Sequence, residues 1–232
     1  PELATDLIRT TNVRVAQFSP GAAPSIVLTE VIPLLDDLDE GKADHSEPTG
    51  GSPSGGIVTI LSNCAPYCDA VHLTDVAKLP VRTHVVDFDA DDDMDILVSD
   101  LGVIAPIDTD QGKIILLERD DAGVFHPTTL AEGLGRVACA EGADLDRDGD
   151  MDVVGCVFGH LNGELMWLEQ TGPLTFEQHT LDPRAGYIHA FPLDLDGDGD
   201  LDIPAVISQV SEEVVLFRGD GAGGFEREVL FQ

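Results

Sequence analysis

The sequence predicts an all-β protein built from four repeated units, each containing four short antiparallel strands. Three observations lead to this fold class. The apolar residues fall in short runs rich in β-branched side chains, and no segment keeps a helical period over three turns. A nine-residue acidic pattern occurs three times, and the same succession of apolar runs follows each copy. A related stretch without the acids precedes them near the start of the chain.

The acidic pattern places aspartate at every second position of a short loop. It reads DFDADDDMD at 87–95, DLDRDGDMD at 144–152 and DLDGDGDLD at 194–202. Carboxylates so close together repel one another unless a cation lies among them, whereas glycine lets the loop curl through positive φ. A hard divalent ion that takes six to eight oxygens at about 2.3–2.6 Å suits this spacing. We therefore predict three calcium loops; the alternative is three hydrated acidic turns.

The first unit keeps the outline of the others and lacks their acids. Residues 13–30 align with residues 83–100, so that Phe18 matches Phe88. The loop positions that carry Asp87, Asp89, Asp91 and Asp95 in the second unit are here Gln17, Ser19, Gly21 and Ser25. We interpret this unit as one that kept its strands and lost its metal.

Each unit continues with three further apolar runs after the strand that enters its loop. The run directly after the loop is expected to be a buried strand, and it lies at 26–28, 96–99, 153–157 and 203–207. The next lies at 57–61, 114–117, 165–168 and 214–217, and a more polar fourth run lies at 70–73, 125–130, 176–181 and 225–230.

Units of this size, with four strands each, predict the blades of a β-propeller. A four-stranded unit cannot bury both of its faces alone, so the units must stack on one another. The loops start at 17, 87, 144 and 194, so the first two loops are further apart in sequence than the others. Residues 36–56 account for this extra length; they are rich in Gly, Ser and Pro and are expected to form a solvated loop. The chain is thus expected to be a single propeller domain, 1–232, or a segment of a larger propeller. The expected blades are 11–75, 80–131, 136–182 and 187–231.

The loops and their flanking strands resemble FG-GAP or VCBS repeats, which also form the calcium-binding blades of integrin α-chain propellers. This resemblance covers nearly the whole chain, from Val13 to Leu230. It implies that side chains at loop positions 1, 3, 5 and 9 and the carbonyl at position 7 bind three Ca²⁺ ions. The implied side-chain ligands are Asp87, Asp89, Asp91 and Asp95; Asp144, Asp146, Asp148 and Asp152; and Asp194, Asp196, Asp198 and Asp202. The implied carbonyls are those of Asp93, Asp150 and Asp200.

The loop at 87–95 departs from the family pattern at position 6. Gly149 and Gly199 occupy this position in the other two loops, whereas the second unit has Asp92. Aspartate tolerates the left-handed region better than most residues, so we expect this site to form and to bind the ion more weakly. The family also commonly builds propellers of six or seven blades, so the resemblance leaves open whether four blades close a ring here.

The strongly acidic composition disfavours nucleic acid and anionic membranes as partners. The chain has 12 basic and 44 acidic residues, a formal charge of −32, which disfavours binding to nucleic acid or to anionic membranes. No apolar run approaches the roughly 18–20 residues of a membrane span, and no charged-then-apolar leader opens the chain, so we expect no membrane insertion.

The four cysteines form two plausible pairs. Cys139 and Cys156 are placed symmetrically about the loop at 144–152 and are expected to be opposite each other in a hairpin, whereas Cys64 and Cys68 enclose a short turn. Two disulfides are favoured over four buried thiols. Together with calcium loops, they predict a secreted, extracellular or periplasmic protein.

No catalytic constellation is recognised. The seven histidines are at 45, 72, 84, 126, 179, 189 and 160, and no two have the spacing of a zinc helix. No serine or cysteine has the context of a nucleophile elbow. We expect polar residues at strand edges and no enzyme activity, which agrees with a family that generally works by binding.

Propeller geometry predicts where binding occurs. The calcium loops join the first and second strands at one face, so the variable connections 31–56, 101–112, 158–163 and 209–213 gather on the opposite face. Length variation on one face is typical of a recognition surface, although tolerated insertions give the same pattern. We predict a non-catalytic calcium-binding module that binds a protein partner or a surface glycan there, as part of a larger extracellular assembly. The alternative is an accessory propeller of a secreted enzyme, such as one acting on polysaccharides.

Overall fold

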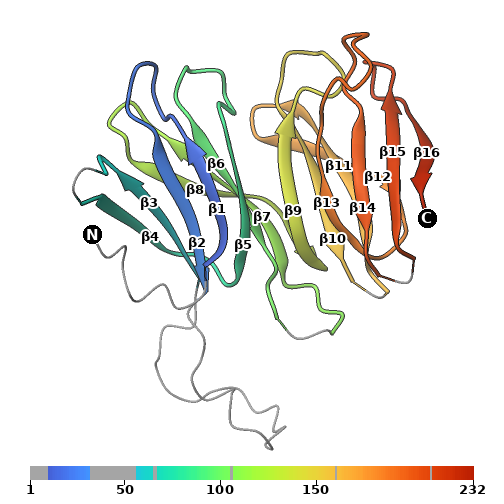
Figure 1. Cartoon of the computed structure of the whole chain (residues 1–232), viewed down its shortest axis with the longest axis horizontal. Coiled ribbons are helices and arrows are strands. Elements are labelled where there is room, and N and C mark those ends of the chain that lie inside the picture. The colour runs from blue at the N-terminus through green and yellow to red at the C-terminus, as the bar shows by residue number, and fades with distance from the viewer. Residues whose placement is uncertain (1–9, 32–55, 65–66, 105–106, 160, 210) are drawn as a thin grey trace, which may run out of the picture.

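The chain folds into β-strands and connecting loops. The structure, a computed structural model, describes residues 10–31, 56–64, 67–104, 107–159, 161–209 and 211–232. Within these residues there are sixteen strands and no helix, arranged as four sheets side by side (Figure 1). The all-β prediction is therefore confirmed. The expected loop at 36–56 lies almost wholly outside the described residues, as does His45.

Each sheet holds four consecutive strands. The first blade contains β1 (Thr10–Ala16), β2 (Ser25–Val31), β3 (Gly56–Ser62) and β4 (Asp69–Ala77). The second contains β5 (Pro80–Val86), β6 (Asp95–Asp100), β7 (Gly112–Arg119) and β8 (Phe125–Leu134). The third contains β9 (Arg136–Ala143), β10 (Asp152–Phe158), β11 (Glu164–Gly172) and β12 (Thr175–Asp182). The fourth contains β13 (Tyr187–Ala190), β14 (Ile203–Ile207), β15 (Glu213–Gly219) and β16 (Phe225–Phe231).

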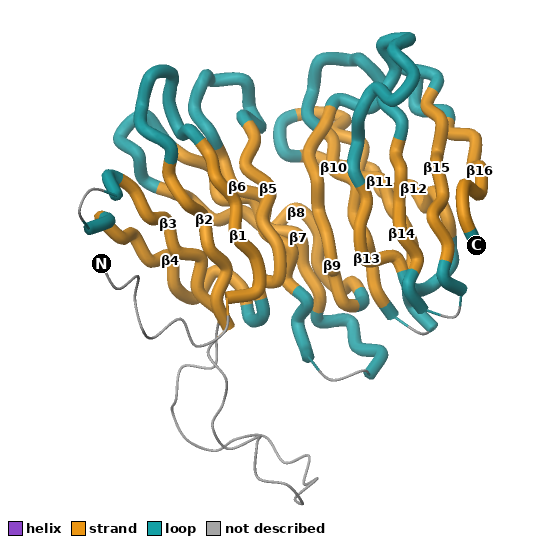
Figure 2. Tube along the Cα trace, viewed as in Figure 1, coloured by secondary structure: helices purple, strands orange, loops and turns teal. Residues whose placement is uncertain are grey.

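Every blade is an antiparallel meander in which the spatial order of strands follows the sequence. This topology needs only hairpin connections. It places the three acidic loops, and the related first-blade loop that lacks the acids, at equivalent positions between the first and second strands of each blade. These loops all lie at one end of the strands, at the top of Figures 1 and 2. In the second, third and fourth blades, the described parts of the connections from second to third strands lie at the other end, as predicted. The corresponding connection of the first blade, predicted at 31–56, lies almost wholly outside the described residues.

The apolar content of each strand matches its place in the blade. All six residues of β6 are buried, and β10 is buried along nearly its whole length, because neighbouring blades cover both of their faces. The fourth strands are mostly exposed, and β16 has no fully buried residue. Charged and polar side chains along such outer strands protect the free edge from pairing with another chain.

The hydrophobic core is divided among the three junctions between consecutive blades. Ile96 and Val98 on β6 pack toward the first blade with Val27, while Leu97 between them packs toward the third blade. A third cluster joins the third and fourth blades and includes Trp167 and Tyr187. Successive side chains of one strand point to opposite faces of the sheet, so a single strand contributes to the hydrophobic clusters on both sides of its blade.

The first and fourth blades form the two ends of this row (Figure 1). Among the described residues, no hydrophobic cluster joins the first sheet to the fourth. On β1, the side chains of Val13 and Val15 are 56% and 71% exposed. In the part of the chain that the structure describes, no helix is long and apolar enough to cross a membrane.

Candidate metal centres

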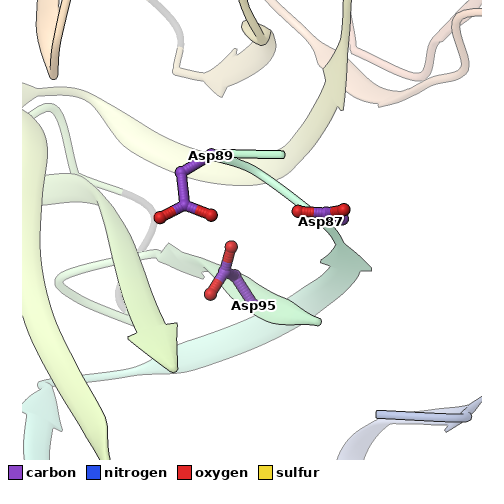
Figure 3. Close-up of side chains that lie close together, drawn as sticks. All are labelled: Asp87, Asp89 and Asp95. Atoms are coloured by element: carbon purple, nitrogen blue, oxygen red, sulfur yellow. The ribbon is translucent and has the colours of Figure 1, made fainter. Parts of the chain in front are cut away.

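The hairpins bring the acids of each loop together. In the second blade, ligand oxygens of Asp87, Asp89 and Asp95 all lie within 4.8 Å of one another (Figure 3). These are loop positions 1, 3 and 9. The third blade repeats the arrangement with Asp144, Asp146 and Asp152, the same three positions. Three carboxylates that converge from one short hairpin form an oxygen-rich pocket of the kind that hard cations occupy.

The fourth blade groups its acids differently. There, Asp194, Asp196 and Asp198 come together, which are positions 1, 3 and 5, and all three are exposed. Asp202, at position 9, is outside that group, as are Asp91 and Asp148 at position 5 of the other loops. Each predicted set of four side chains is therefore brought together in part, with three of its members within range of one another.

The aspartate at position 9 also fixes the loop to the sheet. Asp95 accepts hydrogen bonds from the backbone N–H of Phe88 at 2.9 Å and of Arg119 at 2.8 Å. Asp152 accepts equivalent bonds from Leu145 at 3.1 Å and Gln170 at 2.8 Å. One carboxylate therefore ties the loop to the end of the third strand. Sequence reasoning assigned these residues to the metal alone.

The aspartate at position 1 stabilises the turn by accepting hydrogen bonds from backbone N–H groups of its own loop. The Asp87 carboxylate accepts the backbone N–H of Asp91 and of Asp92, both at 3.2 Å. In the fourth blade, Asp194 accepts the N–H of Gly197 at 2.7 Å and of Gly199 at 3.1 Å. These bonds orient the carboxylates before any ion binds, because they satisfy backbone donors that the tight turn leaves without strand partners.

Two positions in each loop have a left-handed backbone. At position 6, φ is 71° for Asp92, 95° for Gly149 and 94° for Gly199, so Asp92 adopts the conformation expected of it. Position 4 was not recognised from the sequence, and it has φ values of 61° for Ala90, 62° for Arg147 and 82° for Gly197. The residue types at position 4 share no property that reveals this backbone, except for the glycine in the fourth blade.

Burial makes some of these carboxylates difficult to ionise in the absence of a cation. Desolvation raises the pKa of Asp95 to about 6, although the N–H groups of Arg119 and Phe88 favour its charged form. Desolvation likewise raises the pKa of Asp152 to about 6. The pKa of Asp89 is raised by desolvation and then by the neighbouring charge of Asp91. A bound cation would offset both causes.

The donor set passes a further test of fit for Ca²⁺. Asp144 Oδ1 and Asp202 Oδ2 are buried carboxylate oxygens that accept no hydrogen bond from the described residues. Buried acceptors normally have partners, and an oxygen without one is costly. Both belong to predicted ligands, at positions 1 and 9. Hard carboxylate oxygens are what Ca²⁺ prefers, so the residues present suit the ion.

The side chains at position 7 of the second-blade and fourth-blade loops form ion pairs with arginine. Asp93 pairs with Arg119, and Asp200 pairs with Arg147 at 2.6 Å. Arg147 belongs to the loop of the third blade and Asp200 to the loop of the fourth blade, so this ion pair links two neighbouring loops. The pairing is compatible with the predicted role of position 7, in which only its carbonyl faces the metal. Asp93 also lies close to Asp91 and Asp121, which form a further acidic group.

Both predicted cysteine pairs form disulfides. Cys139 and Cys156 are directly paired across β9 and β10, with their Cα atoms 4.9 Å apart, inside the range expected for a bridge. Cys64 and Cys68 form the second disulfide. The first bridge therefore joins the two strands that carry the loop at 144–152.

A cluster of polar side chains lies on the first strands of the four blades, and it was not predicted from the sequence. We call it the axial cluster; it consists of Arg14 on β1, Arg82 and His84 on β5, Glu141 on β9 and His189 on β13. The buried carboxylate of Glu141 pairs with Arg82 Nε at 2.9 Å and Arg14 Nη2 at 3.2 Å. Arg82 also contacts the ring of His189. The cluster draws on all four blades, and no local motif marks residues that far apart.

Residues 144–203 match the family described as FG-GAP-like repeat. The matched segment begins at the first aspartate of the third-blade loop and ends just after the last aspartate of the fourth-blade loop. No curated protein gives a significant match to the chain. The match confirms the resemblance seen in the loops, and with the all-β fold it indicates a binding module of the integrin-like type. The two disulfides are compatible with an extracellular location.

Proposed function

We propose that this chain, an FG-GAP repeat protein, is a non-catalytic and calcium-stabilised binding module of a secreted or periplasmic assembly. The observation that carries the proposal is the convergence of three carboxylates in each of three hairpin loops. The buried, unpaired oxygens of Asp144 and Asp202 support the same conclusion. Asp87, Asp89 and Asp95 would hold one ion, Asp144, Asp146 and Asp152 a second, and Asp194, Asp196 and Asp198 a third.

In this proposal calcium acts on the fold and takes no part in a reaction. Each loop lies at the tip of the hairpin formed by the first two strands of its blade. When bound, the ion neutralises carboxylates whose mutual repulsion otherwise opposes the hairpin. Position 9 transmits this effect to the third strand through its two backbone hydrogen bonds. The ion therefore stabilises three of the four strands of a blade.

The partner is proposed to bind at the end of the strands opposite the calcium loops. A cavity of about 540 Å³ lies there between the second and third blades, lined by residues that include Asp110, Asn162 and Gln178. Beside it the connections of the two blades meet, because Leu161 N–H contacts Asp108 Oδ1 at 3.4 Å. The side chain of Leu161 is 84% exposed, and Ile107 is also exposed. Apolar side chains presented among polar ones suit a protein or glycan surface.

Thermal unfolding with calcium and with chelator tests the metal part of the proposal. Binding to the folded state alone adds about 2.7 kcal/mol per site when free calcium is a hundredfold above Kd. We expect a large rise in Tm with millimolar calcium, and calorimetric titration is expected to give three sites per chain. Equal melting temperatures in calcium and in chelator would contradict the proposal and would favour the alternative that the loops are hydrated acidic turns.

A further inference from the structure

Each blade has two sheet faces, and the residues that follow position 9 of its loop alternate between them. In the second blade, Ile96 and Val98 pack toward the first blade, whereas Leu97 packs toward the third. In the third blade, Val153 packs toward the second blade and Val154 toward the fourth. We call the face turned to the preceding blade the backward face and the opposite one the forward face.

The forward face of the fourth blade is apolar, although no described blade covers it. Pro204 and Val206 lie two and four places after position 9 of the loop. Leu216 and Val214 are paired with them on β15. The corresponding residues of the third blade all lie in the cluster that joins it to the fourth, whereas these four belong to no hydrophobic cluster of the described residues. Phe231, paired with Val214 on the same face, is 70% exposed.

The backward face of the first blade is apolar and uncovered in the same way. Ile26 and Leu28 lie one and three places after position 9 of its loop. Val15 and Val13 are paired with them on β1, and Leu61 is paired with Ile26 on β3. The corresponding residues on β6 and β7 lie in the cluster that joins the second blade to the first, whereas these five belong to none in the described part of the chain. Val13 and Val15 are more than half exposed.

The two uncovered faces are opposite in kind and match the two sides of one further junction. The chain makes such a junction three times, each time with a forward face against a backward face and an apolar cluster between them. The fourth blade therefore has the type of surface that covers the backward face of a blade. The first blade has the type of surface that covers a forward face.

The two faces of one chain do not meet. Contacts in the axial cluster reach two blades along the row, because Arg14 of the first blade pairs with Glu141 of the third and Arg82 of the second contacts His189 of the fourth. Among the residues that the structure describes, no hydrogen bond, ion pair or hydrophobic cluster joins β1 to β13. Figure 1 shows the first and fourth blades at the two ends of the row. A second copy of the chain has both of the faces that these two lack.

The size of the faces favours a dimer that uses both of them. A sheet of four strands, spaced about 4.8 Å apart and each about six residues long, has a face of roughly 400 Å². One junction then removes roughly 800 Å² from water, the size of a crystal-packing contact, whereas two junctions remove roughly 1,600 Å², the size of a stable interface. A stable dimer therefore needs both junctions at once.

We propose that two copies of this chain close a ring of blades, with the fourth blade of each copy against the first blade of the other. The two junctions are related by a two-fold axis, the commonest symmetry of soluble oligomers. Twice four blades is within the range of known propellers. The formal charge of −32 per chain opposes association, so the dimer is expected to weaken in low salt. The proposal does not depend on metal in the loops.

Sedimentation equilibrium of the full chain at physiological ionic strength tests the ring. One chain has a mass of 24.7 kDa, and we expect twice this mass at micromolar protein concentrations. The mass of a single chain at all concentrations below millimolar would overturn the proposal. A mass that keeps rising beyond two chains would overturn it as well, because it would indicate an open row that does not close.

Two surface variants test the two faces separately. Val15→Lys on the backward face and Phe231→Lys on the forward face each place a charge in the proposed junction. Both positions are exposed in the single chain, so the fold should be kept, as circular dichroism can verify. Because the ring contains each substitution twice, the Kd of the dimer should rise at least a hundredfold in either variant.

Val124→Lys is the matched control. Val124 is 52% exposed and lies in the turn between β7 and β8, away from both end faces, so this variant should dimerise like the wild type. Wild-type dimerisation in either face variant would refute the ring. Loss of the dimer in Val15→Lys alone would indicate that first blades pair with each other, which also contradicts the proposal.

Discussion

Aspartate has several roles within each acidic loop, and its position decides which one applies. At position 9, Asp95 and Asp152 are buried and accept two backbone hydrogen bonds each. At position 7, Asp93 and Asp200 form ion pairs with arginine. The remaining positions curl the loop or converge on the candidate metal centre. Substitution by alanine at different positions should therefore give different phenotypes.

Asp198→Ala is expected to act mainly through the metal. Asp198 is exposed and converges with Asp194 and Asp196, so its removal should lower Tm when calcium is present. The loss corresponds to up to about 2.7 kcal/mol at a hundredfold excess of calcium over Kd. In chelator the same substitution should have a much smaller effect. Ser19→Ala in the first loop is the matched control and should do little in either condition; an equal effect of Asp198→Ala in both would contradict its role as a ligand.

Ala90→Gly is expected to stabilise the second-blade loop. Ala90 has φ of 61°, which costs a residue with a Cβ about 1–2 kcal/mol. Glycine removes this strain and adds unfolded-state entropy, leaving a net gain of up to about 1 kcal/mol by chemical denaturation. Gly197 is the equivalent residue in the fourth blade, and its Cβ position has no atom within 4 Å. Gly197→Ala should therefore destabilise by backbone strain alone, and a neutral result there would refute the explanation.

At the level of elements, the sequence predicted the strands well because each blade repeats one order of apolar runs. The two middle strands of a blade are buried on both faces, and their continuous apolar runs, such as that of β10, are the clearest signals in the chain. The boundaries at the fourth strands were less accurate. β8 extends to Leu134 and β4 to Ala77, beyond the apolar runs, because hydrogen bonding to the third strand continues through polar and glycine residues.

The disulfide within the third blade is expected to stabilise its hairpin. Cys139 and Cys156 are 17 residues apart in sequence, and closing a loop of that size is worth about 3 kcal/mol through the unfolded state. The double substitution to alanine should lower the free energy of unfolding by about this amount, plus the packing lost in the core. Replacing Cys64 and Cys68, which are only 4 residues apart, is the control and should cost less. The opposite order would show that loop closure does not dominate.

On the scale of the whole molecule, the junctions between blades hold the features that sequence reasoning could not reach. The fold class followed from the repeat, since a four-stranded unit must stack on its neighbours. The axial cluster did not, because its residues come from β1, β5, β9 and β13 and meet only after the blades have packed. The same holds for the ion pair of Arg147 with Asp200, which joins two loops. Local patterns predict elements; contacts between distant elements depend on the packing.

The axial cluster should make stability depend on pH below neutrality. Desolvation, and then the charges of Arg14 and Arg82, lower the pKa of His84 to about 4 from 6.5. The unfolded chain therefore takes up a proton first as the pH falls, and the folded state loses stability between pH 6.5 and about 4. The contribution of His84 over this window is on the order of 2 kcal/mol.

His84→Asn isolates this effect from the titration of the many acids. The variant keeps the acceptor for Gly142 N–H and cannot take up a proton, while Arg14, Arg82 and Glu141 remain around it. The stability difference between wild type and variant, measured by denaturant unfolding at a series of pH values, should move in favour of the variant as the pH falls. A difference that stays constant across the window would contradict the assignment.

The third blade joins a disulfide and a candidate metal loop in one hairpin, so reduction of the disulfide would be coupled to ion binding if this loop holds calcium as proposed. The bridge between Cys139 and Cys156 holds together the strands whose tip carries Asp144 and Asp152. If the oxidised hairpin binds calcium more tightly than the reduced one, thermodynamic reciprocity requires calcium to lower the reduction potential of the bridge by the matching amount. Such a hairpin would retain its ion where thiols are oxidised and release it under reducing conditions.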